Sequence, residues 1–242
     1  MKSCKTILFL LLAATSGAAQ ESTAPSRVNL FMGTADDYGQ MAPGATVPFG
    51  MIQVCPDSNP RQHPGYDYEQ PLISGISLNR LSGVGGSGCG GNVALLPGKL
   101  GQEIRIDKQT EEATPGYYAA TLSNGVRVRL TATTHMAVEE FTFPQGGEQT
   151  ITLNPTASFE RVHDSDFRVL DDHSARGYVE SRNTCGRGRY HLFYRLFTDQ
   201  PFTAETLTDG RVALHLQTDG RRTAEVRIVV SSGIEELLTN LN

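Results

Sequence analysis

The residues whose types could support chemistry are concentrated in a glycine-rich stretch at residues 81–97, LSGVGGSGCGGNVALLP. A glycine inside a helix or strand costs roughly 0.5–1 kcal/mol, and glycine is used where backbone turns sharply or approaches a ligand. We therefore expect a shaped loop here. Its thiol and its accessible backbone N–H groups could contact a ligand, which makes Cys89 and Gly90 candidate site residues. The alternative interpretation is a structural loop with a buried or disulfide-bonded cysteine.

Cysteine chemistry is limited by number and spacing. Four cysteines occur, and Cys4 lies in a segment that we expect to be removed, which leaves Cys55, Cys89 and Cys185. No CxxC pair is present to suggest structural zinc. One disulfide or three buried thiols would both fit this count. If Cys89 lines a site, we expect it to be free, with any disulfide joining Cys55 to Cys185.

The remaining polar clusters suggest weaker possibilities. Catalytic fingerprints such as GxSxG, HExxH or a P-loop do not occur, and the histidines show no ligand spacing. The clusters His163-Asp164-Ser165-Asp166 and Asp171-Asp172-His173 could bind a cation through oxygen ligands, although solvated loops are the favoured interpretation. Four arginines around Cys185 could bind an anion, although an exposed strand face is favoured there: Arg182, Arg187, Arg189 and Arg195.

The elements that must position these residues have the pattern of β-strands. Apolar residues precede the glycine-rich stretch at Ile76 and Leu78 and follow it at residues 93–96, so two strands are expected to hold the loop. Residues 117–122 and 126–133 flank Asn124-Gly125 and predict a hairpin. Asp209-Gly210 and Asp219-Gly220 predict two further hairpin tips. Many short strands separated by turns indicate an all-β fold, an antiparallel β-sandwich.

Length and composition limit the number of domains, and the net charge argues against some classes of partner. The chain has 242 residues, of which 38% are hydrophobic and 19% charged, so it can form one large all-β domain or two small ones. Its formal net charge of -5 and the lack of a basic tail argue against nucleic acid or an anionic membrane as the partner.

The two ends differ from the strand-rich middle. Residues 1–19 combine Lys2 and Lys5 with an apolar run and small residues, which predicts a cleaved signal peptide and a secreted or periplasmic product. At the other end four apolar residues follow helical spacing, and they predict the first turns of an amphipathic helix: Ile234, Leu237, Leu238 and Leu241. Such a helix could lead into a further domain or could fold back on the sandwich.

Several ordered motifs resemble glycoside hydrolase family 92, the exo-acting α-mannosidases. They begin with VNLFMGT (28–34) and PGATVPFGMIQ (43–53), followed by Pro56-Asp57 and Gly65-Tyr66. They continue through LSG (81–83), GCGG (88–91), Leu96-Pro97, PGYY (115–118), LTAT (130–133) and Phe143-Pro144. The resemblance covers roughly the first 120 residues after the signal peptide, and the PGATVPFGM block is its most specific part.

This resemblance implies the N-terminal β-sandwich, or supersandwich, of a two-domain enzyme. In the family this domain packs on a C-terminal (α/α)6 barrel, and a calcium-assisted inverting mechanism acts in the pocket between them. The resemblance places the acid and base in the barrel, so no catalytic residue and no metal ligand is expected here, and calcium is expected to be bound mainly by the barrel. The implied domains are 1–19 signal peptide, 20–232 sandwich and 233–242 start of a linker helix.

The resemblance also implies which residues of the sandwich form the wall of a mannose pocket. They are Tyr38, Gln40, Asp57, Tyr66, Cys89 and Gly90. The family often carries histidine in the first loop and before LSG, where this chain has Tyr38, Gln40, Leu78 and Arg80. The expected partners are a mannose-containing glycan and the catalytic domain. The alternatives are a stand-alone carbohydrate-binding module and an interaction domain of an exported protein.

Overall fold

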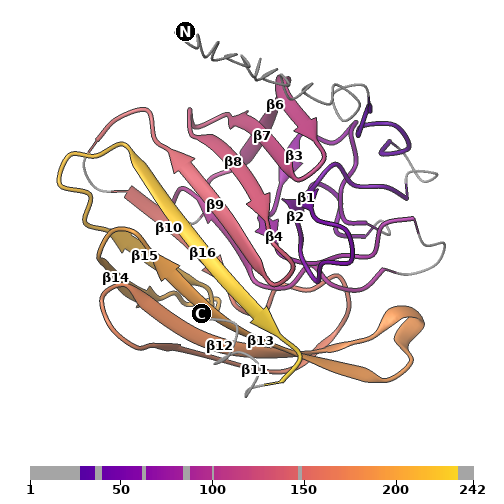
Figure 1. Cartoon of the computed structure of the whole chain (residues 1–242). Helices are drawn as coiled ribbons and strands as arrows, with labels where there is room; N and C mark the ends of the chain where they lie inside the picture. The colour runs from indigo at the N-terminus through magenta and orange to yellow at the C-terminus, as the bar shows by residue number, and fades with distance from the viewer. Residues whose placement is uncertain are drawn as a thin grey trace, which may run out of the picture.

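The strands of this chain form two antiparallel sheets that enclose one hydrophobic core (Figure 1). The computed structural model describes residues 28–35, 40–61, 64–83, 88–99, 101–146 and 149–233. In chain order the strands are β1 (Ala45–Thr46), β2 (Gln53–Pro56), β3 (Leu72–Ile73), β4 (Ile76–Ser77), β5 (Ala94–Pro97), β6 (Ile104–Thr114), β7 (Tyr117–Leu122), β8 (Arg127–Ala132), β9 (Met136–Thr142), β10 (Gln149–Asn154), β11 (Val162–Val169), β12 (Ser174–Arg182), β13 (Arg189–Thr198), β14 (Phe202–Thr206), β15 (Val212–Leu216) and β16 (Thr223–Ser231). A short 3-10 helix, η2 (Thr184–Gly186), lies between β12 and β13.

The strand order shows how the two layers are built. One sheet runs β1-β2-β4-β5-β10-β15-β14, and the other runs β11-β12-β13-β16-β9-β8-β7-β6-β3. Along β8, Val128 and Leu130 are buried while Arg129 between them is exposed, as expected for a strand with one face on the core. The all-β antiparallel sandwich predicted from the sequence is therefore confirmed.

Turn chemistry predicted two hairpins and failed at a third turn. Asn124-Gly125 joins β7 to β8, and Asp209-Gly210 joins β14 to β15, which are paired neighbours in each case. Asp219 and Gly220 both adopt positive φ, 45° and 81°, as their types suggest. The hairpin prediction there is wrong, because β15 and β16 belong to different sheets. The turn carries the chain from one layer to the other.

Residues 163–166 also differ from the favoured interpretation, since they lie in the edge strand β11 rather than in a loop. An edge strand leaves one side unpaired and can carry charged residues that discourage pairing with other chains. The predicted signal peptide at 1–19 and the predicted helical residues 234–242 lie outside the described residues. Within the described ranges, no helix is long and apolar enough to cross a membrane.

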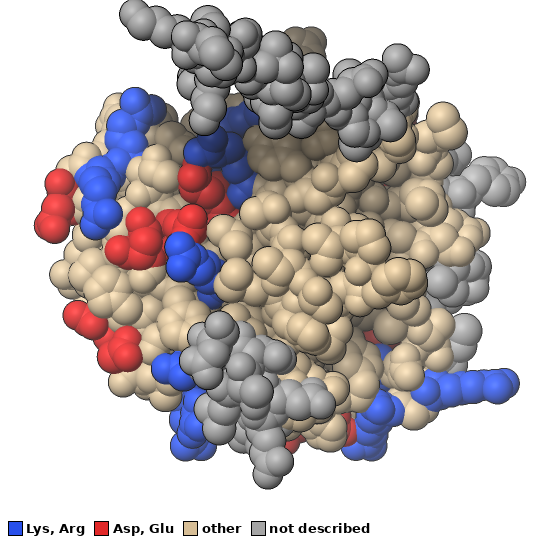
Figure 2. All heavy atoms as spheres, viewed as in Figure 1, with Lys and Arg blue, Asp and Glu red and all other residues tan. Residues whose placement is uncertain are grey.

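Charged side chains are unevenly spread over the surface (Figure 2). In this view Lys, Arg, Asp and Glu lie mixed at the left. The centre and upper right, over β1 and β2 and the loops beside them, are almost free of charge, and basic side chains reappear at the lower right (Figures 1 and 2). The segment between β1 and β2 exposes two apolar residues of the PGATVPFGM block, Phe49 and Met51.

Candidate functional site

The glycine-rich loop is closed at its base by the two strands that hold it. β4 pairs with β5 through Ile76 and Leu95, and an isolated antiparallel bridge joins Arg80 to Gly90. Gly90 adopts φ 97°, and a Cβ there would lie 2.4 Å from the backbone oxygen of Asn79. Only glycine combines this backbone conformation with this approach. The loop therefore has a fixed base, as its composition predicts.

Phe159 packs against the base of the glycine-rich loop. Its backbone N–H donates to the Gly90 carbonyl at 2.9 Å. A Cβ on Gly65 would come within 2.0 Å of the Phe159 ring, and one on Gly91 within 2.4 Å, so the two glycines leave the space that the ring fills. The Arg80 guanidinium lies 5.6 Å from the ring centroid. The Phe159 ring thus packs between two segments: the one that connects β2 to β3, at Gly65, and the end of the glycine-rich loop, at Gly91.

Arg80 is the buried centre of the site. Its guanidinium donates to the carbonyls of Cys55 at 2.7 Å and Pro64 at 2.9 Å, and its Nε donates to the Gln53 carbonyl at 3.2 Å. One guanidinium nitrogen also lies 2.9 Å from Asp57 Oδ1 in an ion pair whose two side chains are buried. Removing one partner of such a pair typically costs about 3–5 kcal/mol, because the other charge is left uncompensated.

Asp57, expected to accept hydrogen bonds from a sugar, is held by the fold itself. It is 3% exposed, and its Oδ1 accepts from Ser77 Oγ at 2.8 Å as well as from Arg80. Burial raises the pKa of this carboxyl to about 6, and Arg80 and the Ser77 hydrogen bond oppose that rise. In this structure the carboxylate orders Arg80 and strand β4.

Tyr66 is likewise turned inward. It is 0% exposed, and its hydroxyl donates to Glu111 Oε1 at 2.7 Å, where the Tyr118 hydroxyl also donates at 2.6 Å. Lys108 Nζ lies 3.2 Å from Glu111 Oε2 and 4.7 Å from the centre of the Tyr66 ring. Burial, and then the nearby Glu111 carboxylate, raises the pKa of Tyr66. Its ring has no exposed face on which a sugar could stack in this structure.

Gln40 and Cys89 are the half-exposed members of the predicted set. The Gln40 carbonyl accepts from the Gly83 N–H, which ties the first loop to LSG. The Gln53 side chain reinforces the tie, since it donates to the Ala42 carbonyl at 3.2 Å and accepts from Ser82 Oγ at 3.0 Å. Cys89 Sγ accepts a hydrogen bond from Thr184 Oγ1 at 3.2 Å.

The structure therefore joins the buried Gly90 to Arg80, leaves Cys89 beside it half-exposed, and ties Gln40 to the start of the same loop at Gly83. It places Asp57 and Tyr66 in the interior. Tyr38 lies outside the described residues. Cys55 is a free, buried thiol on strand β2, so the Cys55–Cys185 pairing, expected if any disulfide formed, does not form. Cys89 is free, as expected for a cysteine at a site.

Metal binding finds no support among the described residues, where no group of three or more His, Cys, Asp or Glu side chains is placed to hold an ion. Asp164 accepts from the Tyr178 hydroxyl at 2.6 Å, and Asp171 accepts from the His173 N–H and from Ser174 Oγ, both at 2.9 Å. These two carboxylates therefore accept hydrogen bonds within their own strand pair and turn.

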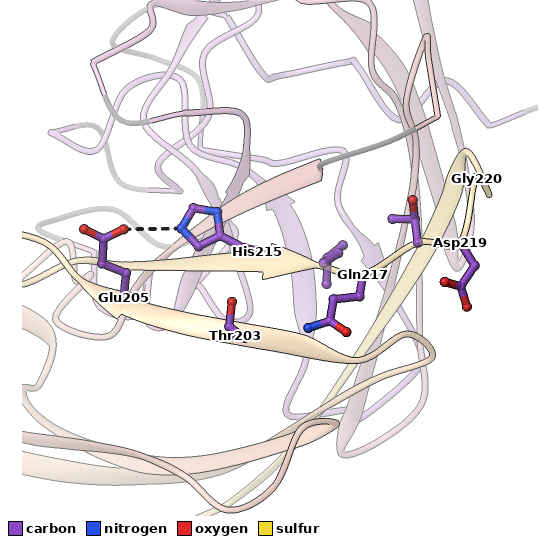
Figure 3. Close-up of a pocket in the computed structure, with 8 residues that line it drawn as sticks. Thr203, Glu205, His215, Gln217, Asp219 and Gly220 are labelled. Carbon is purple, nitrogen blue, oxygen red and sulfur yellow. Dashed lines mark hydrogen bonds and ion pairs between the residues drawn. The ribbon is translucent and has the colours of Figure 1, made fainter.

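A separate shallow hollow lies at β14 and β15 (Figure 3). Glu205 and His215 point toward each other across the two strands, with Oε2 and Nε2 3.4 Å apart. His215 Nδ1 also lies 3.2 Å from Thr150 Oγ1. None of the predicted site residues lines this hollow, and its lining includes no Phe, Tyr or Trp ring on which a sugar could stack (Figure 3).

Reasoning from the sequence missed two residues that organise the site, Phe159 and Asn92. Asn92 is buried and accepts from the Tyr190 hydroxyl at 2.5 Å, and it donates to the Ala157 carbonyl at 3.1 Å. An asparagine directly after a glycine turn and a lone phenylalanine in a polar segment are the available signals. Neither identifies its partner, since the contacts join segments more than 60 residues apart.

Comparison with known proteins assigns the family. The sequence model described as "Glycosyl hydrolase family 92 N-terminal domain" matches residues 27–231. The chain belongs to this family. The resemblance seen in the motifs is thereby confirmed.

Similar proteins are much longer than this chain. A protein of Arthroderma benhamiae described as an uncharacterized secreted glycosidase is 29% identical over 154 residues, which are 57% of this chain and 20% of that protein. The solved family GH92 α-mannosidase of Bacteroides thetaiotaomicron matches with a TM-score of 0.76 at 23% identity, over 88% of this chain and 34% of its own. Its complex with mannoimidazole gives a TM-score of 0.77 at 23% identity, over 90% and 34% of the two chains.

Proposed function

We propose that this chain is the N-terminal domain of a secreted α-mannosidase that hydrolyses terminal α-mannosides of glycans with inversion. The observation that carries the proposal is the family match over residues 27–231. It is supported by the fold shared with α-mannosidases, one of them solved with mannoimidazole. The relative described as a secreted glycosidase supports export, and the signal peptide predicted at 1–19 would provide it.

The chain's own contribution is a wall of the sugar pocket. Gln40 and Cys89 are half-exposed, so a pyranose could meet an amide and a thiol there, while the buried Gly90 holds the base of the loop through its bridge to Arg80. Tyr38, predicted from the resemblance as a further wall residue, remains part of the proposal. Asp57 and Tyr66 act from the interior, by holding Arg80 and the segment at residues 64–66 in place.

The catalytic carboxylates are proposed to come from another domain. Inverting hydrolysis needs an acid and a base about 6.5–9.5 Å apart across the scissile bond, with room for water. Asp57, the site carboxylate, is buried and bound to Arg80 and Ser77. Calcium dependence is part of the proposal, with the ion bound mainly by the catalytic domain.

The uncharged face over β1 and β2 is proposed as the surface on which the catalytic domain docks (Figure 2). Interfaces between permanent partners are depleted in charge at their centres and enriched in aromatic residues and methionine. Phe49 and Met51 are exposed there, and Met41 lies exposed beside Gly33 and Gly83 at the edge of the site.

The experiment compares this chain alone with a form that carries the family's catalytic domain after residue 242. Each is incubated with an aryl α-mannoside, with calcium and with a chelator. We expect release of the aryl group by the long form with calcium, and none by the 242-residue chain. Turnover by the short chain that survives further purification would place catalysis in this domain. Mannan binding by the short chain, together with an inactive long form, would favour a carbohydrate-binding module.

A further inference from the structure

Three arginines stand in a row across the outer face of the larger sheet. Arg168 on β11 lies directly opposite Arg176 on β12, and Arg176 lies directly opposite Arg195 on β13. Neighbouring strands are about 4.8 Å apart, so the three side chains start within about 10 Å of one another. We call these three residues the arginine row.

The arginine row is poorly compensated within the chain. Like charges directly opposite each other on paired strands are destabilising. Arg168 has an ion-pair partner, with Nε 2.8 Å from Asp166 Oδ2. The side chains of Arg176 and Arg195 form no ion pair or hydrogen bond with the described residues, and Arg195 Nε is buried without a partner. Arg195 packs with Cζ 4.9 Å from the centre of the Phe197 ring.

Some negative charge does lie near the row. The pKa of Asp171 is lowered, first by hydrogen bonds from His173 and Ser174 and only lastly by Arg195. The Asp171 carboxylate therefore already accepts hydrogen bonds from the neighbouring residues of its own turn. The guanidinium groups remain available for planar, two-point binding of an oxyanion.

Aromatic rings adjoin the row on the same face. Tyr178 and Phe193 are opposite each other and lie two residues from Arg176 and Arg195 along β12 and β13. Their ring centroids are 5.9 Å apart, and His191 stacks on Phe193 at 6.1 Å with an interplanar angle of 15°. We call Tyr178 and Phe193 the ring pair. Both side chains are half-buried, and together they form an apolar surface next to the arginine row.

This face lies away from the candidate sugar pocket. β11 starts at Val162, close after Phe159, and Arg168 follows six residues later. At about 3.3 Å per residue this is about 20 Å along the strand. A ligand bound here would leave the loops around Arg80 unobstructed.

We propose that the arginine row and the ring pair form a second binding site, for an acidic glycan. A sulfate or carboxylate group of the glycan pairs with Arg176 and Arg195, and a sugar ring packs on Tyr178 and Phe193. Asp164, Asp166 and Glu180 occupy neighbouring positions on this face, so the positive charge is confined to the arginine row, and the site can hold one or two anionic groups of a glycan at a time. The chain's membership of a carbohydrate-active family favours a glycan over nucleic acid.

Affinity electrophoresis of the 242-residue chain tests this site without any hydrolysis. The gels contain dextran sulfate, polygalacturonate, neutral mannan or duplex DNA, at low and at high salt. We expect retardation by at least one of the two acidic glycans, and the pair of gels identifies whether sulfate or carboxylate is preferred. We expect Arg176→Gln and Arg195→Gln each to weaken this binding at least tenfold. Phe193→Ala should weaken glycan binding while leaving competition by inorganic sulfate unchanged.

The control is Arg105→Gln, which removes an exposed arginine of β6 that pairs with Glu103. It should leave binding unchanged. Because the arginine row is self-repulsive, Arg176→Gln should unfold at the same or a higher denaturant concentration than the unchanged chain. The proposal is overturned if neither acidic glycan retards the chain at low salt, if Arg105→Gln weakens binding equally, if duplex DNA binds as tightly through Arg176, or if Arg176→Gln is destabilised.

Discussion

Glu139 is the residue whose environment is least suited to its charge. It lies on the inward side of β9 and is 0% exposed, and neither carboxyl oxygen has a hydrogen-bond partner among the described residues. Burial, followed by the charge of Asp57, raises its pKa well above the usual range. The native state therefore holds a proton that the unfolded chain releases above its ordinary pKa. Stability must fall as pH rises from the unfolded value toward the folded one.

This gives a prediction about pH. The free energy of unfolding should decrease as the pH rises above the ordinary pKa of a glutamate, with a slope of up to about 1.4 kcal/mol per pH unit from this one group. Glu139→Gln should flatten the slope, because its side chain does not titrate. The measurement is urea unfolding followed by circular dichroism at several pH values. Glu140→Gln, at an exposed pair with Arg129, is the control and should keep the slope. If Glu139→Gln leaves the slope unaltered, the pH dependence of stability does not come from Glu139.

Thiol reactivity separates the two described cysteines. Burial raises the pKa of Cys55 to about 12, and that thiol is shielded from reagents. Cys89 is half-exposed, and the thiolate is the reactive form of a cysteine. In the folded chain we expect a maleimide to modify Cys89 without added reductant, and to modify Cys55 only after unfolding. Peptide mapping by mass spectrometry checks this, with Cys89→Ser as the control. Modification of Cys55 at the same rate as Cys89 would contradict the buried position.

What the sequence can show about single residues is their type, and it does not show their partner. Asp57 was expected to face a sugar, and the structure instead pairs it with Arg80, 23 positions away. Tyr66 was expected to offer a ring, and its hydroxyl reaches Glu111, 45 positions away. Such pairs depend on how the strands are arranged in the sandwich. Cys89 and Gly90 were easier to place, because the surrounding glycines already indicate a tight loop.

At the scale of elements, local chemistry predicted turns and strands well. The glycine-rich loop does lie between two paired strands, and Asn124-Gly125 does close a hairpin. The failure at Asp219-Gly220 has a physical cause. A turn type fixes the local path of four residues, and the sheet that the following strand joins is decided by its long-range pairing with β9 and β13. β11 was missed because its charged outer residues hide the alternation of an edge strand.

The glycines around Phe159 give a prediction about these elements. Gly91→Ala should destabilise the chain by about 2–4 kcal/mol, because its Cβ would overlap the Phe159 ring and the residue has φ 71°. Adding Phe159→Leu should recover part of the loss. Gly210→Ala is the matched control: φ is 85° there and nothing lies within 4 Å, so only the backbone strain of about 1–2 kcal/mol remains. Equal losses in denaturant unfolding at both glycines would show that the ring does not fill this space.

At the scale of the whole molecule, the sandwich has two unlike surfaces. One carries acidic and basic side chains together, at the left of Figure 2, and the other is the uncharged face over β1 and β2 (Figures 1 and 2). The sequence predicted the sandwich, because strand patterns and turn signals recur along the whole chain. It could not predict the uncharged face, since the residues that form a surface come from loops that are distant in sequence.

Phe49 links this face to the proposed docking of a catalytic domain. It occupies the third position of the turn closed by the Gly50 N–H and the Val47 carbonyl at 3.0 Å, with φ 61° and an exposed fraction of 102%. A type II turn prefers glycine at this position, and a bulky residue in the left-handed region costs about 1–2 kcal/mol. A strained and fully exposed aromatic ring gives the isolated chain no stability. Such strain is typical of residues retained for function.

Substitution of Phe49 should therefore act oppositely in the short and long forms. In the 242-residue chain, Phe49→Gly should raise the free energy of unfolding by about 0.5–1 kcal/mol, because the strain is relieved, while Phe49→Ala should leave it nearly unchanged. In a form that carries the catalytic domain, Phe49→Ala should weaken docking by about 2 kcal/mol, as expected for a central aromatic contact. Unfolding of the short form and kcat/KM of the long form measure the two effects. Leu170→Ala, 44% exposed after β11, is the control. If it weakens the long form as much as Phe49→Ala, or if neither change does, the catalytic domain docks elsewhere.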